Sequence, residues 1–231
     1  MTGADSRPAE PAFHPQVEPI FATPFGQATV PDAASLNPAV AALLSQRAVP
    51  ERADPASRPP VMYRSRDDLV AWPEEPVRKL LGGIAGAALA VVRTVNQFSD
   101  EQFSALQVQP RAWYSIVRPD GSIASRNFSN AAWCAIYCAA APQPSATRHD
   151  SGLLRLHESF QATMFSDATN TLLSPPFQSG HRTWRPVPGQ LAVFPASLRH
   201  EVATMRGEGE LMLVTMLLRF LSAGQQGLPW W

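Results

Sequence analysis

The sequence predicts an α+β fold in which helices come first and an antiparallel β-barrel follows. Apolar residues recur at helical spacing up to about residue 95, whereas short apolar runs separated by Gly- and Pro-containing turns dominate from residue 105 onward. A series of short strands with such turns is typical of a jelly roll or cupin-like barrel. The 231 residues of the chain fit one domain of this kind.

Two helices are predicted before the barrel. The first opens at residues 31–34 and places four apolar side chains on one face, those of Leu36, Val40, Leu43 and Leu44. The second covers residues 76–95 and is the longest helical pattern of the chain. Glycines lower the helix propensity of this second segment, so we expect it to pack closely against a sheet.

Most of the predicted strands lie in the second half of the chain. Residues 17–30 alternate in polarity but contain Pro19 and Pro24, which restricts this segment to the edge of a sheet. The other strands are predicted at residues 106–117, 132–139, 152–157, 183–186, 190–195, 201–205 and 211–220.

The chain is expected to have three parts. Residues 1–16 are rich in Pro, Ala and polar residues and are predicted to form a disordered arm. Residues 17–221 form the barrel domain, and residues 222–231 form a tail that carries Trp230 and Trp231. Within the domain, residues 160–180 read as a long polar loop, and a loop of that length usually covers a site or an interface.

Charge and cysteine content restrict the partners and the compartment. The formal net charge is zero, so neither nucleic acid nor an anionic membrane is an expected partner. No segment is apolar for long enough to cross a bilayer, and the N-terminal residues lack the apolar core of a signal peptide. Cys134 and Cys138 would lie about 13 Å apart on a strand, beyond disulfide reach. Free cysteines fit a reducing compartment, so we expect a cytoplasmic protein.

Several short motifs occur in a characteristic order along the chain. They are Ile-Phe-Ala-Thr-Pro at residues 20–24, Asn37, Ser-Arg-Asp-Asp-Leu at 65–69, Ala112-Trp113, Trp-Cys-Ala-Ile-Tyr at 133–137, Ser-Gly-Leu-Leu at 151–154, and Pro-Gly-Gln-Leu-Ala-Val-Phe-Pro at 188–195 followed by His200. In their order and spacing, the chain resembles the small bacterial 2-oxoglutarate/Fe(II) oxygenases. The resemblance implies a double-stranded β-helix with the N-terminal helices packed on the barrel.

The resemblance also implies that the family's metal ligands have been replaced in this chain. Such a site holds Fe(II) with a facial triad, and two of the ligands come from a His-x-His or His-x-Asp step that falls here on Arg126 and Phe128. An arginine has no free lone pair and a phenylalanine has no donor atom. The third ligand matches His200, whereas Glu210 stands near the position of the arginine that would bind 2-oxoglutarate. Neither Fe(II) nor 2-oxoglutarate is therefore an expected cofactor.

Four residues are candidates for catalysis without Fe(II) and 2-oxoglutarate: Arg126, His200, Tyr137 and Glu210. Arg126 is expected to point into the barrel, where Glu158, Glu210 or a bound anion would pair with it. The alternative is a surface arginine in a turn. His200 is expected to be a repurposed polar group, and Tyr137 either donates a proton in the cavity or packs in the core.

The remaining candidates would contact a ligand in the barrel. Trp113, Phe128 and Trp133 are expected to supply apolar walls, and His157 is expected to border the cavity from a neighbouring strand. Aromatic residues at such spacing are also typical of an ordinary core.

Three functions remain open from the sequence. The leading hypothesis is a pseudoenzyme of a biosynthetic pathway, whose cavity binds a small molecule or peptide without metal or catalyses a non-oxidative reaction such as a cyclisation or isomerisation. The second is a non-catalytic subunit of a homodimer or heterodimer, with Trp230 and Trp231 at the interface. The third is a working oxygenase in which His149, His157 and His200 hold Fe(II) and 2-oxoglutarate is the cosubstrate.

Overall fold

A computed structural model of the chain describes residues 22–143, 147, 149–157, 180–222, 224–225 and 230. The described residues from Thr23 onward belong to one compact unit. The predicted arm at residues 1–16, nearly all of the predicted loop at 160–180, and the end of the tail with Trp231 lie outside the described residues. The disordered arm and the covering loop therefore stay predictions.

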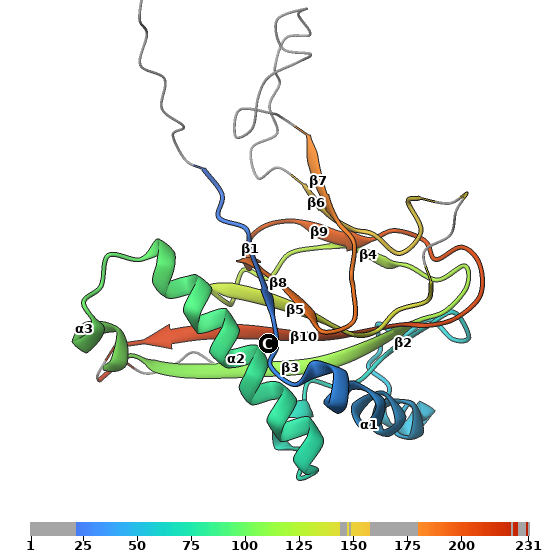
Figure 1. The fold of residues 1–231 in the computed structure, drawn as a ribbon, viewed down its shortest axis with the longest axis horizontal. Helices are drawn as coiled ribbons and strands as arrows, with labels where there is room; N and C mark the ends of the chain where they lie inside the picture. Colours follow the sequence, from blue (N-terminus) through green and yellow to red (C-terminus); the bar gives the residue numbers. More distant parts are fainter. Residues whose placement is uncertain are drawn as a thin grey trace, which may run out of the picture. The chain divides into compact units, whose positions relative to one another are not determined.

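Two antiparallel sheets build the domain (Figure 1). One has six strands in the order β1-β8-β5-β10-β3-β2, and the other has four in the order β4-β9-β6-β7. The strands are β1 (Gly26–Thr29), β2 (Met62–Arg64), β3 (Gln107–Val117), β4 (Ile123–Arg126), β5 (Trp133–Ala140), β6 (Leu154–His157), β7 (His181–Trp184), β8 (Gln190–Pro195), β9 (His200–Val202) and β10 (Leu211–Leu221). The helices are α1 (Ala33–Gln46), α2 (Glu75–Val95) and α3 (Asp100–Ser104).

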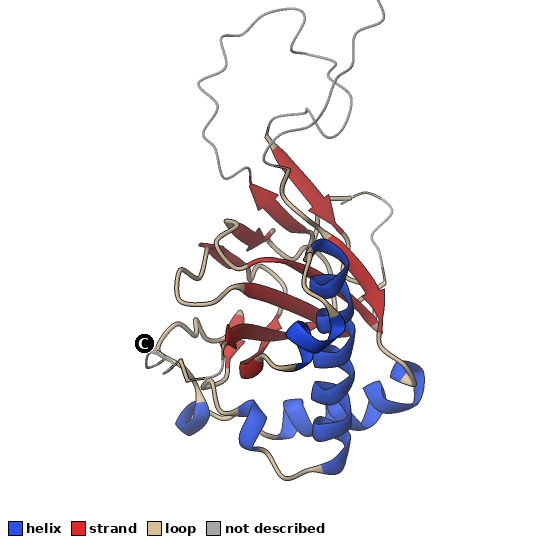
Figure 2. Cartoon of the chain, turned by 90° about the vertical axis from the view of Figure 1, so that its left-hand side faces the viewer, coloured by secondary structure: helices blue, strands red, loops and turns tan. Residues whose placement is uncertain are grey.

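The six-stranded sheet is buried on both faces, and successive residues of each strand alternate between two cores. On β5, Ala135 and Tyr137 join the core beneath α1 and α2, whereas Cys134, Ile136 and Cys138 join the core between the two sheets. Figure 2 shows the helices gathered on one side of the strands. This layering separates a barrel interior from a helix-covered face, and each face lines its own cavity.

Close packing of α2 against the sheet explains one of its glycines. A Cβ atom at Gly83 would lie 2.5 Å from Cγ1 of the buried Val30, whereas one at Gly82 or Gly86 would have nothing within 4 Å. The expectation that this helix packs closely on the sheet is therefore met at Gly83. The other two glycines weaken the helix with no packing reason.

The predicted fold class, a double-stranded β-helix with helices packed on the barrel, is confirmed. The long strands β3, β5, β8 and β10 and both long helices lie close to their predicted positions, and β1 is an edge strand. The sequence analysis missed β2 and β4, because each is short. Among the described residues, no helix is both long and apolar enough to cross a membrane.

Alanine substitutions in α2 test this packing. Gly86→Ala should raise the free energy of unfolding by about 0.5–1 kcal/mol, because alanine is the better helix former. Gly83→Ala gains the same propensity but must displace Val30, so it should be less stable than Gly86→Ala by about 1–3 kcal/mol. Urea unfolding of the two variants measures the difference, and equal stabilities would show that Val30 does not restrict this position.

Candidate functional site

A small cavity lies between the two sheets, at the position where the resemblance places the metal site. Its volume is about 20 Å³. A cavity needs roughly 10–15 Å³ to hold one water molecule, whereas pockets for drug-sized ligands begin near 300 Å³. The barrel interior thus has room for about one water molecule with its side chains as they stand.

Arg126 and His200 meet in this cavity. The antiparallel pairing of β4 with β9 places Arg126 directly opposite His200 in register, and directly opposed residues on one face of a sheet are neighbours. Both side chains line the cavity. The prediction that Arg126 points into the barrel therefore agrees with its position, and the alternative of a surface arginine in a turn does not.

His200 is a neutral imidazole in an apolar setting. Its side chain is 4% exposed, and the ring lies 5.0 Å from that of Phe194 and 5.6 Å from that of Phe128, centroid to centroid. Burial lowers the pKa of His200 to about 4, against the opposing effect of a backbone hydrogen bond with Leu198. Nδ1 lies 2.9 Å from the carbonyl oxygen of Leu198. In the neutral ring, Nδ1 therefore carries the proton and Nε2 keeps a free lone pair.

Arg126 is a charged group with no acidic partner among the described residues. Its Nε donates to the carbonyl oxygen of Ala124 at 3.3 Å. Burial, followed by repulsion from Arg64, lowers the pKa of Arg126. Glu210, one of its predicted partners, instead accepts from Nε of Arg118 at 2.7 Å. Glu158, the other, lies outside the described residues.

Arg64 is the second guanidinium of the cavity, and its charge is compensated. It pairs with Asp54 and Asp67, and its guanidinium carbon lies 4.5 Å from the ring centroid of Trp113. Asp67 also pairs with Arg111. Asp54 acts on Arg126 from a distance and opposes the lowering of its pKa, but neither carboxylate forms an ion pair with Arg126.

Two hydroxyl groups and a wall of aromatic rings complete the lining. Ser115 of β3 and Thr215 of β10 are buried and face the cavity. The rings of Trp113 and Phe128 meet edge to face, 5.3 Å apart. Trp113 and Phe128 thus occupy the predicted wall, and Phe128 fills much of the space between Trp113 and His200.

Tyr137 and Trp133 do not reach this cavity, which corrects their predicted roles. Both side chains belong to or pack on the core beneath the helices, on the opposite face of β5. The Tyr137 hydroxyl donates to Oδ1 of Asn37 at 2.6 Å. It therefore cannot be a proton donor in the barrel. Alternate residues of a strand point to opposite faces of the sheet, and Tyr137 and Trp133 lie on the face that is turned away from the cavity.

Glu210 and His157 are also placed away from the cavity. Glu210 precedes β10 and pairs with Arg118 at the surface. His157 is half-buried on β6, where Leu156 rather than His157 pairs with His200. Its Nε2 lies 3.6 Å from Oε1 of Glu201. His157 therefore lies on the outer face of the four-stranded sheet.

The residues of the cavity do not fit a facial Fe(II) triad. Among the described residues of the lining, His200 alone offers a nitrogen lone pair, and none is Asp, Glu or Cys. The alternative set of His149, His157 and His200 is not brought together, since His149 is exposed and His157 faces away. Across the part of the chain that the structure describes, no group of three His, Cys, Asp or Glu residues is arranged to hold a metal ion.

Trp230 is half-buried and contacts two arginines of the same chain. Its ring centroid lies 3.8 Å from the guanidinium carbon of Arg219 and 5.7 Å from that of Arg111. The indole also packs against the core between the sheets. The predicted interface role of Trp230 and Trp231 stays a prediction.

The sequence analysis missed Arg64, Ser115 and Thr215 as parts of the site. Ser115 interrupts the largely apolar stretch 112–117 of β3, and Thr215 interrupts the apolar stretch 211–218 of β10, on the same faces as Trp113 and Leu213. That interruption was visible in the sequence. Arg64 carried no such signal, because its short strand was not predicted.

Acid should destabilise the protein through His200. The folded-state pKa of about 4 lies below the ordinary value of 6.5, so between these values the unfolded chain binds a proton that the folded chain does not. The contribution to stability is complete above pH 6.5 and is lost as the pH falls toward 4. The loss between pH 7 and pH 5 should be about 2 kcal/mol, measured by urea unfolding at both pH values.

His200→Leu should remove this part of the pH dependence while keeping an apolar side chain in the core. The matched control is His181→Leu, which changes an exposed histidine on β7 and should retain the wild-type pH dependence. If wild type and His200→Leu lose the same stability between pH 7 and pH 5, the imidazole is not held neutral in the fold.

Comparisons with known proteins agree with this fold. Residues 111–215 match the family model described as "Putative 2OG-Fe(II) oxygenase". No curated protein matches the chain in sequence. A prolyl-4-hydroxylase from Pseudomonas putida has a similar structure, with a TM-score of 0.54 and 20% identity over 84% of this chain and 91% of that chain.

Two proteins from Streptomyces are also similar in structure. AviO1 from Streptomyces viridochromogenes Tue57 has a TM-score of 0.53 and 18% identity over 90% of this chain and 94% of that chain. HygX from Streptomyces hygroscopicus, solved with nickel and 2-oxoglutarate bound, has a TM-score of 0.55 and 16% identity over 89% of this chain and 85% of that chain. As the sequence predicts, the barrel of this chain therefore resembles the 2OG-Fe(II) oxygenases in sequence and shares their double-stranded β-helix fold.

Proposed function

We propose that the barrel of this chain is a metal-independent binding site for a small molecule that carries an anionic group, such as a carboxylate. The observation that carries the proposal is the charge of the cavity. Arg126 faces His200 where the related fold would place metal ligands, and none of the described residues that line the cavity carries a carboxylate. A lining of this kind repels a cation and attracts an anion.

The hydrogen-bonding groups of the lining support an anionic ligand. The Arg126 guanidinium presents N–H donors in a planar fork that matches a carboxylate in two-pronged fashion. The hydroxyl groups of Ser115 and Thr215 are able to donate as well. His200 is neutral at pH 7, so it adds no charge of its own.

Entry of such a ligand requires Phe128 to move. The cavity of about 20 Å³ holds no carboxylate as it stands. Phe128 follows the end of β4 and is only partly buried. Its backbone N–H donates to the carbonyl oxygen of Ala196, in the turn between β8 and β9. A rotation of its side chain would open space beside Arg126 without breaking this backbone bond.

Binding is favoured over proton-transfer catalysis. A general base works best with a pKa near the operating pH, and the pKa of His200 is about 4. Tyr137 is on the other face of the sheet and Glu210 is at the surface. The barrel thus offers recognition groups but no efficient base. A place in a biosynthetic pathway and a cytoplasmic location remain predictions.

A carboxylate titration tests this function. Acetate, benzoate and phenylacetate are added to wild type at constant ionic strength, and the melting temperature is recorded. At least one should raise it saturably, because a ligand of the folded state stabilises that state. Arg126→Gln should weaken the binding roughly 10- to 100-fold, since a charge-assisted hydrogen bond contributes about 1.5–3 kcal/mol.

Arg118→Gln is the matched control, because it removes a guanidinium that pairs with Glu210 outside the cavity. It should bind the carboxylate with the affinity of wild type. The proposal fails if no carboxylate stabilises wild type, or if Arg126→Gln binds it as well as Arg118→Gln does.

A further inference from the structure

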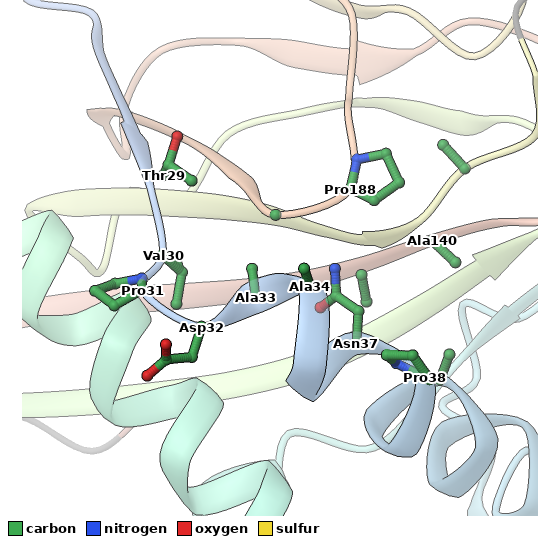
Figure 3. Close-up of a pocket in the computed structure, with 14 residues that line it drawn as sticks. Thr29, Val30, Pro31, Asp32, Ala33, Ala34, Asn37, Pro38, Ala140 and Pro188 are labelled. Carbon is green, nitrogen blue, oxygen red and sulfur yellow. The ribbon is translucent and has the colours of Figure 1, made fainter.

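A second and much larger cavity lies on the helix-covered side of the six-stranded sheet. It is an open groove of about 770 Å³ between the start of α1 and the ends of β5 and β8 (Figure 3). Small-molecule sites typically measure about 300–1,000 Å³ and combine apolar walls with a few well-placed polar groups. The groove has this size, and none of its lining residues belongs to the barrel cavity.

The walls of the groove are small and apolar. Three proline rings and several alanine methyl groups form most of the surface, with Pro31, Pro38 and Pro188 at its margins. Asp32 is the only charged residue in the lining, and Figure 3 shows its carboxylate pointing away from Asn37. The groove therefore suits an uncharged and largely apolar molecule.

One buried donor is aimed into this apolar surface. Asn37 is 9% exposed, and its Oδ1 accepts from the Tyr137 hydroxyl at 2.6 Å. Burial raises the pKa of Tyr137 to about 12, so the hydroxyl keeps its proton and fixes the amide with Oδ1 toward the sheet. Nδ2 then points into the groove (Figure 3), and it makes no hydrogen bond to another described residue.

We infer that this groove binds an uncharged, largely apolar small molecule with a carbonyl oxygen that accepts from Nδ2 of Asn37. Tyr137 is a positioning residue, because it acts by orienting the amide. Nδ2 is not fully buried, so a molecule in the groove reaches it. A ligand carbonyl that accepts from Nδ2 replaces its hydrogen bond to water within an otherwise apolar surface. This site is separate from the proposed barrel site and does not depend on it.

A protein partner fits the groove less well than a small molecule. Interfaces between proteins are anchored by Trp, Tyr and Arg side chains. The lining of the groove has none of these residue types, and its polar recognition rests on one amide.

Titration with Nile red tests the inference, since this dye is uncharged, apolar and bears a carbonyl. Wild type should bind about one equivalent with an increase in fluorescence. Ala34→Trp places an indole in the groove from an exposed position of α1 and should weaken binding at least tenfold. Ala39→Trp is the matched control, because Ala39 is exposed on the same helix but outside the lining. It should bind as wild type does.

Asn37→Asp tests the donor itself. The carboxylate still accepts from Tyr137 but no longer donates into the groove, so Nile red should bind at least tenfold more weakly. The Ala34→Trp comparison stands even if Asn37→Asp fails to fold. Arg126→Gln should bind Nile red normally, which separates this site from the barrel.

Several results would overturn the inference. They are the absence of Nile red binding by wild type, equal binding by Ala34→Trp and Ala39→Trp, and unchanged affinity in a folded Asn37→Asp variant. Sedimentation of the same proteins provides a further check. If Ala34→Trp converts a wild-type dimer to a monomer, a second copy of the chain occupies the groove, and the small-molecule site is wrong.

Discussion

The pairing of β4 with β9 determines which charged and polar side chains meet inside the barrel. It places Arg126 opposite His200 inside the core between the two sheets. Burial keeps the imidazole neutral, and the carboxylates nearest to the cavity are engaged by Arg64 and Arg111. Among the described residues, Arg126 thus has no ion-pair partner, as the proposed anion site requires. Phe128 lines the same cavity, whose volume is only about 20 Å³.

The six-stranded sheet divides the molecule into two chemical environments. Alternate residues of β5 serve opposite faces, with Ile136 in the barrel and Tyr137 beneath the helices. On the second face, the hydrogen bond between Tyr137 and Asn37 ties α1 to the sheet and fixes the amide at the edge of the groove. The fold thus supports a charged site and an uncharged site from the two faces of one sheet.

Sequence reasoning placed site residues correctly where a family motif marked their positions. It failed where the face of the strand that carries a side chain had to be chosen. The family resemblance put Arg126 and His200 at positions of metal ligands, and the structure brings both to one cavity. The sequence left the cavity and the core open for Tyr137 and Trp133, since β5 is buried on both sides and no polar residue marks which face is which. The structure places both side chains at the core beneath the helices. The pairing of Glu210 with Arg118 is also a long-range contact that no local pattern reveals. Arg64 was missed because β2 has only three residues.

Anaerobic calorimetric titration with Fe(II) tests most directly whether the barrel has lost its metal site. Wild type should bind no stoichiometric Fe(II), because Arg126 and Phe128 supply no ligand atoms. The double variant Arg126→His, Phe128→Asp provides a histidine and a carboxylate two residues apart, beside His200, and should bind about one equivalent. Stoichiometric Fe(II) binding by the wild-type protein would contradict the account.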